Sequence, residues 1–110
     1  MTKNQVWEML YGSWKSDDGK ITFQIKDEMI YWDQKPYAGH IIVISYYEPF
    51  DKWMINVPMF FWAHTYITKL NENLLEVTDY DNGNPAESII IDPVTKKPLN
   101  GGKVFKFIKL

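Results

Sequence analysis

The densest group of side chains that could hold a ligand lies between residues 60 and 66, where the sequence reads FFWAHTY. If this segment is a β-strand, its side chains alternate between two faces. One face then carries three aromatic rings and an imidazole, from Phe60, Trp62, His64 and Tyr66. Pointing inward, these side chains suit a flat or apolar small molecule held by stacking and by one or two polar contacts. The alternative is that the rings fill the interior of a small barrel.

Two other aromatic segments could line the mouth of the same cavity. Residues 29–33 read MIYWD and residues 45–48 read SYYE. Tyr and Trp combine an apolar body with a polar tip, which suits the rim of a binding site, so we add Trp32 and Tyr47 to the candidate ligand-binding residues. Alternatively, these rings form an outer surface that contacts a second copy of the chain. Trp53 is expected at a turn or at a barrel end.

The chain offers little for metal binding or for catalysis. It has no cysteine, which excludes disulfides and thiolate chemistry. His64 could ligate a metal or haem if it is buried, but His40, the other histidine, is distant in sequence and expected at an exposed loop end. No serine lies in a Gly-x-Ser-x-Gly elbow, and the acidic residues of segment 76–81 do not favour a catalytic carboxylate pair. We therefore predict no metal, no cofactor and no catalytic residue.

Turn-forming residues divide the chain into short segments of strand length. Pairs such as Asp18-Gly19 and Asn82-Gly83 favour hairpin turns, and turn signals recur about every 8–12 residues, as in a sandwich or an antiparallel barrel. The expected strands cover residues 13–16, 20–26, 29–33, 40–48, 53–57, 60–70, 74–81, 87–91 and 103–110. Ahead of them, the helical spacing of apolar side chains predicts a short helix over residues 4–11.

These segments predict an all-β fold: a small antiparallel up-and-down β-barrel with a short N-terminal helix, in one domain over residues 1–110. Closure of a barrel leaves no unpaired strand edge to protect. The segment 40–48 is apolar on both faces, so we expect it to be covered from inside and from outside the barrel. An open sandwich is the main alternative.

The stretch LYGSWKS over residues 10–16 places Gly12 two positions before Trp14, directly after the expected helix. It resembles the opening of the calycin superfamily, which includes lipocalins and fatty-acid-binding proteins, and the chain is similar in length to small bacterial lipocalin-like domains. The resemblance implies that Trp14 closes one end of the barrel and that a basic residue of the last strand packs across it. Lys106 or Lys109 can supply that cation, and we assign Lys106 to the motif. The family more commonly has arginine there, and this chain contains none.

The charge and hydropathy of the chain bear on whether it binds nucleic acids or membranes. The net charge is −2 and the lysines are scattered, which argues against a nucleic-acid-binding protein. No apolar run approaches the roughly 18–20 residues of a membrane helix, and the first residues lack the apolar core of a signal peptide. We therefore expect neither a nucleic acid nor a membrane as partner, and a cytoplasmic location unless a signal was removed.

The sequence leads to one main functional hypothesis and two rivals. The main hypothesis is a non-catalytic protein that binds a small apolar or aromatic ligand inside the barrel, near Trp62, His64 and Tyr66. The first rival is a protein–protein interaction module, such as an inhibitor, an immunity-type protein or a homodimer, whose barrel is filled by its own side chains. The second rival is a small enzyme on a barrel scaffold, since a fold alone does not fix a function.

Overall fold

The computed structural model describes residues 1–32, 39–57, 65–80, 94–95 and 103–110. It begins with helix α1 (Lys3–Leu10), and a short 3-10 helix, η1 (Glu48–Phe50), joins two of the strands. The strands are β1 (Gly12–Ser16), β2 (Thr22–Lys26), β3 (Met29–Trp32), β4 (Gly39–Ile41), β5 (Val43–Tyr47), β6 (Lys52–Asn56), β7 (Thr65–Leu70), β8 (Leu74–Asp79) and β9 (Lys103–Lys109).

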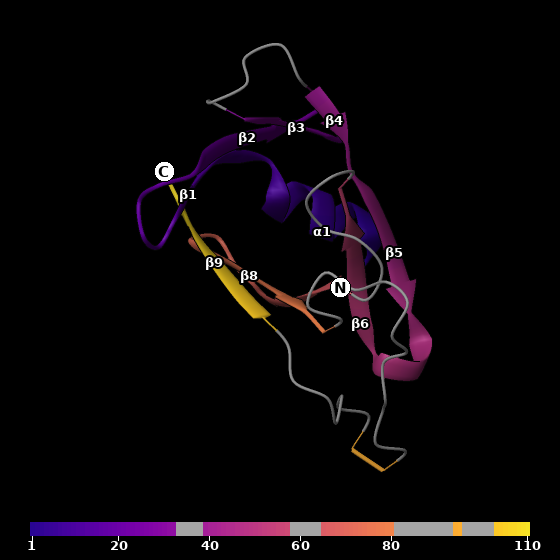
Figure 1. Ribbon diagram of the computed structural model, residues 1–110. Helices are drawn as coiled ribbons and strands as arrows, with labels where there is room; N and C mark the ends of the chain where they lie inside the picture. Colours follow the sequence, from indigo (N-terminus) through magenta and orange to yellow (C-terminus); the bar gives the residue numbers. More distant parts are fainter. Residues whose placement is uncertain (33–38, 58–64, 81–93, 96–102) are drawn as a thin grey trace.

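All of these strands belong to one antiparallel sheet in the order β4-β3-β2-β1-β9-β8-β7-β6-β5. The pairing of β1 with β9 brings together the two ends of the chain. The strands at the two ends of the sheet, β4 and β5, are consecutive in the chain and separated by Ile42 alone, so the sheet curls until its ends meet (Figure 1). The result is a nearly closed up-and-down β-barrel, which confirms the predicted fold class.

Helix α1 lies within the ring of strands in Figure 1 and closes one end of the barrel. It starts with a capping box: Gln5 donates its backbone N–H to the Thr2 hydroxyl (3.2 Å), and the Thr2 N–H donates to the Gln5 side-chain oxygen (2.7 Å). Its buried side chains, Val6, Trp7 and Leu10, form one stripe that joins the barrel core. The short helix predicted from the spacing of apolar residues is therefore confirmed, and its apolar side chains are the buried ones.

The interior of the barrel is filled by side chains of the described residues. Phe23 packs edge-on against Phe107 at 5.0 Å between ring centroids and lies tilted against Trp32 at 5.1 Å. The other strand residues in this core are Trp14, Ile25, Ile30, Ile44, Ile55, Leu75 and Val77, with Ile42 and Val57 beside them. Burying one such side chain contributes about 1.5–3 kcal/mol, so the packed interior is a main source of stability.

The segment 40–48, expected as one strand, is divided at Ile42, whose N–H donates to the Glu28 carbonyl (3.1 Å). Before this point the chain pairs with β3, and after it with β6. The expectation that both faces are covered is wrong, because Ile41 and Val43 are 64% and 52% exposed. Only the alternate residues, Ile42 and Ile44, reach the core.

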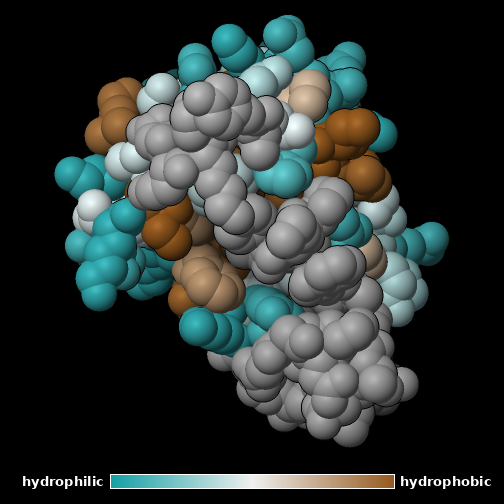
Figure 2. All heavy atoms as spheres, turned by 45° about the horizontal axis from the view of Figure 1, so that its top comes forward, coloured by the Kyte–Doolittle hydropathy of each residue, from teal (hydrophilic) through white to brown (hydrophobic). Residues whose placement is uncertain are grey.

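Exposed hydrophobic side chains occur on several strands, among them Ile21, Ile41, Val43 and Ile108. Figure 2 shows, among the coloured residues of that face, separate hydrophobic patches surrounded by hydrophilic side chains. Among the described residues, no helix is long and apolar enough to cross a membrane. The expected strand at 87–91 lies outside the described residues, and the expected strand at 60–70 is described only from Thr65 onward.

Candidate functional site

Tyr66 lies on the outer face of the barrel. In the sheet it is directly opposite Thr78, which is opposite Val104, a half-exposed residue. Directly opposed residues of antiparallel strands point to the same side of the sheet, so Thr65 and Ile67 face inward instead. This corrects the hypothesis that Tyr66 points into the lumen; the other members of that set, Phe60, Trp62 and His64, lie outside the described residues.

Tyr66 instead belongs to an outer aromatic cluster made of Tyr47, Phe50, Tyr66 and Tyr80. The Phe50 ring meets Tyr66 edge-on at 4.8 Å and Tyr80 at 5.3 Å, while Tyr47 lies 5.8 Å from Tyr66. Burial raises the pKa of the Tyr80 hydroxyl. Two predicted ligand-binding residues, Tyr47 and Tyr66, are thus neighbours, but outside the barrel. The third described one, Trp32, points into the core against Phe23.

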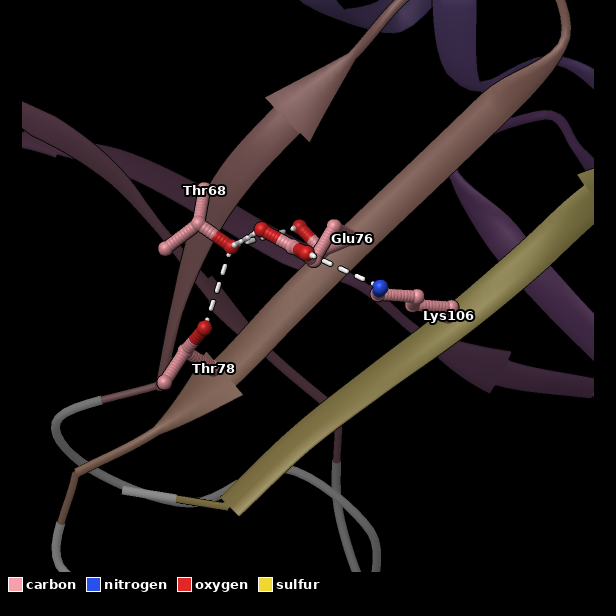
Figure 3. A network of polar contacts seen from close by, with 4 residues as sticks. All are labelled: Thr68, Glu76, Thr78 and Lys106. Atoms are coloured by element: carbon pink, nitrogen blue, oxygen red, sulfur yellow. Dashed lines mark hydrogen bonds and ion pairs between the residues drawn. The ribbon is translucent and has the colours of Figure 1, made fainter. Parts of the chain in front are cut away.

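A polar network borders this cluster on the outer face (Figure 3). The Thr68 hydroxyl donates to a carboxylate oxygen of Glu76 at 2.8 Å and lies 3.0 Å from the Thr78 hydroxyl. The Lys106 ammonium is 4.0 Å from the other Glu76 oxygen. Thr68 lies two positions after Tyr66, on the same outer face, at a bulge between Ile67 and Lys69 where it has no directly paired residue in β8. Lys106 therefore faces outward, which corrects its assignment to the Trp14 motif.

Lys109 supplies the cation at Trp14. The two residues are directly opposite in the β1–β9 pairing, and the ammonium lies 4.7 Å from the centre of the indole ring. Lys106 is three positions away on the same strand and so points to the other face. Trp14 is fully buried and donates its indole N–H to the Leu10 carbonyl (2.8 Å). The motif thus joins the end of α1 to the first and last strands.

A cleft of about 480 Å³ opens between α1 and the strand ends of β5, β6 and β7. It is lined by Met1, Val6, Tyr46, Asp51, Trp53, Ile67, Thr68, Lys69 and Leu70. Tyr46, Trp53 and Ile67 are opposed in turn across β5, β6 and β7, so they form one inward-facing row. The rings of Tyr46 and Trp53 lie 5.3 Å apart and are tilted by 56°. Trp53 and Ile67 are partly buried against the core, and Tyr46, at the end of the row, is 49% exposed.

The Tyr46 ring is held in place through its hydroxyl. The hydroxyl donates to the Asp51 carboxylate, and Asp51 sits in the left-handed conformation (φ 53°) that ends η1. This hydrogen bond is the main reason why the pKa of Tyr46 is raised above its usual value. Because the hydroxyl is engaged and the side chain is 49% exposed, Tyr46 offers its ring rather than its polar tip to the cleft.

A second hollow of about 590 Å³ lies on the solvent side of α1. It is lined by Met1, Gln5, Glu8, Met9 and Glu72, a set with two carboxylates and no aromatic ring. Within the described part of the chain, no three His, Asp or Glu residues lie close enough to hold a metal ion. The cleft beside Tyr46 and Trp53 is therefore the better candidate for binding an apolar molecule.

The sequence analysis named the segment 45–48 as part of a cavity mouth but chose Tyr47 as the ligand-binding residue, whereas the structure places Tyr46 in the cleft. Trp53 was placed at a turn or a barrel end, and the structure puts it in β6 at the end closed by α1. Tyr46 lies opposite Trp53 because residues 48–51 connect the two strands and Tyr47 is paired with Lys52; the turn expected at 49–52 would have placed Tyr47 opposite Met54 instead, so the pair was missed. No protein-family model matches the chain, and neither the curated proteins nor the solved structures that were searched contain a match.

Proposed function

We propose that this protein is a non-catalytic binding protein that holds a small, mainly apolar or aromatic molecule in the cleft beside α1. The observation that carries the proposal is the aromatic pair Tyr46 and Trp53 in a cleft of about 480 Å³. Sites for small molecules commonly measure about 300–1,000 Å³ and combine apolar walls with a few polar groups. The resemblance of the Gly12-x-Trp14 opening to the calycin superfamily, whose lipocalins enclose small ligands, supports the same function.

The mouth of the barrel is a better place for the ligand than its centre. The centre contains buried rings such as Trp14, Phe23 and Phe107, each at most 3% exposed. A ligand there would have to displace side chains whose burial is worth about 1.5–3 kcal/mol each. At the mouth, Tyr46 and Trp53 already offer ring surface to solvent, so binding covers apolar area without unpacking the core.

The lining suggests how such a molecule is held. An aromatic ligand can pack on the Tyr46 and Trp53 rings in an offset or edge-on arrangement, which adds about 0.5–1.5 kcal/mol beyond the area buried. Val6, Ile67 and Leu70 supply aliphatic walls. The segment Thr68–Lys69 also lines the cleft and lies within reach of polar groups of the ligand.

The proposal can be tested with the aromatic probe 8-anilinonaphthalene-1-sulfonate, whose fluorescence rises in apolar sites. Tyr46→Ala should weaken binding by about two- to tenfold, the factor expected for loss of an aromatic contact. Tyr31→Ala is the matched control, because Tyr31 lies on β3 and does not line the cleft. Equal affinity in the wild type and both variants would contradict the proposal, as would the absence of probe binding.

Native mass spectrometry of gently purified protein provides an independent test. A molecule bound during expression should appear as an added mass on the wild type and should be reduced in Trp53→Ala, which removes the larger ring of the pair. Wild-type protein that carries no added mass and does not bind the probe would count against a ligand at this cleft.

A further inference from the structure

Among the described strands, β5 is paired along one edge only. It pairs with β6 over all of its residues, Val43–Tyr47, and stands at the end of the sheet, so no described strand pairs with its second edge. The reason is the break at Ile42: up to that point the chain pairs with β3, and Ile42 donates to the carbonyl of Glu28 in the β2–β3 turn (3.1 Å). Beyond it, β5 runs past the end of the β2–β3 hairpin (Figure 1).

This edge lacks the features that normally prevent strands from pairing between molecules. Natural edge strands are protected by Lys, Pro, bulges or very short length. β5 reads VISYY, with no charged residue, no proline and no glycine, and its pairing with β6 is regular over five residues. Its surface is also partly apolar, because Val43 and the neighbouring Ile41 are 52% and 64% exposed. Its composition and its exposure both favour addition of another strand.

We propose that β5 pairs with β5 of a second copy of this chain, antiparallel, across a two-fold axis at Ser45. In this register Val43 faces Tyr47 of the partner subunit, and Ile44 faces Tyr46 of the partner subunit. Pairs of a β-branched and an aromatic residue are among the favourable cross-strand pairs. At the axis Ser45 lies opposite Ser45 of the partner subunit. Ser45 is exposed and its side chain is small, so the two strands can approach without a steric clash there.

The sequence of the strand is the reason to choose a second copy as the partner, because a two-fold register at Ser45 places a β-branched residue opposite an aromatic one on both sides of the axis. Each chain carries a net charge of −2, so two copies repel one another over most of their surfaces. β5 is uncharged, and the nearest acidic side chain, Glu48, falls opposite Ile42 of the partner subunit in the proposed register rather than opposite its own copy. The strand can therefore meet itself without opposing like charges. A two-fold contact of this kind is the commonest form of homodimer.

The first test compares the mass in solution of the wild type, Ser45→Lys and Gln24→Lys over a series of concentrations, by light scattering after size exclusion. Gln24 is the matched control, because it is an exposed polar residue on β2, which has strands on both sides. Wild type and Gln24→Lys should rise from 13.0 kDa towards twice that mass. Ser45→Lys should remain a monomer, because it places two lysines opposite each other at the axis. A wild type that stays monomeric, or a Ser45→Lys variant that dimerises equally well, overturns the proposal.

The second test uses the absence of cysteine from the chain. Ser45→Cys introduces a single thiol at the axis, where directly opposite Cβ atoms are about 4.5–5.5 Å apart and close to the range that a disulfide spans. Mild oxidation should give a covalent dimer on a non-reducing gel, much faster than for Gln24→Cys. Equal rates for the two variants overturn the two-fold axis at Ser45. Neither test depends on ligand binding at the cleft.

Discussion

Lys109 holds the last turn of α1 against the barrel while its ammonium lies 4.7 Å from the centre of the Trp14 ring. The same ammonium donates to the backbone carbonyls of Met9 (3.2 Å) and Tyr11. The end of a helix leaves carbonyl oxygens without partners in the helix itself, and Lys109 supplies donors at that position. One side chain of the last strand thus connects the helix, the first strand and the core.

The first prediction concerns this connection. Lys109→Met keeps most of the apolar stem but removes the cation and its hydrogen bonds, so we expect the free energy of unfolding to fall by about 2–4 kcal/mol. Lys106→Met is the control: its ion pair with Glu76 is long, 4.0 Å, and the Lys106 side chain is 51% exposed, which limits the loss to about 1 kcal/mol or less. Urea unfolding measures both. Similar losses for the two variants would contradict a special role for Lys109.

The second prediction concerns Gly12, which has a φ of +132°. A Cβ at this position would lie 2.6 Å from Cε of Lys109. Gly12→Ala is therefore both strained in its backbone and crowded, and we expect a loss of about 1–3 kcal/mol in thermal or urea unfolding.

The double variant Gly12→Ala with Lys109→Ala separates the two effects. If crowding contributes, the combined loss should be smaller than the sum of the two single losses, because the contact has already been removed. Strict additivity would show that only the backbone conformation matters.

The third prediction concerns the β1–β2 hairpin. The Asp18 carboxylate accepts hydrogen bonds from the Ser16 hydroxyl (2.6 Å) and from the Lys20 N–H (2.9 Å), which lower the pKa of Asp18 below its usual 3.8. A carboxyl group with a lowered pKa stabilises the folded state above the unfolded value and loses this effect as the pH falls through the folded value. Asp18→Asn should therefore lower the melting temperature at pH 7, and the difference should shrink as the pH falls below 3.8. A difference independent of pH would contradict this.

The fourth prediction concerns the rim of the cleft. Because the Asp51 carboxylate accepts the Tyr46 hydrogen bond and adds a nearby negative charge, the pKa of Tyr46 lies above 10.0. Asp51→Asn removes the charge, and asparagine also tolerates the left-handed backbone at this position. The pKa of Tyr46 should then fall towards 10.0, as measured by ultraviolet difference titration with Tyr46→Phe as the reference that lacks this phenol. An unchanged titration would contradict the role of Asp51.

Much of the fold could be predicted because its signals are local. The helix follows from the spacing of Val6, Trp7 and Leu10, and the first hairpin from Asp18-Gly19 between segments that alternate. The break at Ile42 could not be predicted, because it arises from a change of pairing partner between β3 and β6. Both pairings are local, but the residue at which one hairpin ends and the next begins depends on how the whole sheet curls, which no short segment encodes.

The candidate site was harder to predict than the fold. Alternation placed Tyr66 on the opposite face from Thr65 and Ile67, but it cannot say which face is inward. The bulge at Thr68 then shifts the alternation, so that Leu70 rather than Lys69 faces the core. Alternation favoured Lys109 over Lys106, because Lys109 shares its face of the last strand with Phe105 and Phe107 and Lys106 lies on the other face.

The pairing of β1 with β9 also determines when this protein can complete its fold. Trp14 and Lys109 are paired although almost the whole chain separates them, and contacts of such long range form slowly because a large loop must close first. During synthesis β1 leaves the ribosome long before β9 is made, so β2 is its only neighbouring strand until then. The hairpins can form as they emerge. The barrel cannot close, and the Lys109 ammonium cannot pack on the Trp14 ring, until β9 has been made.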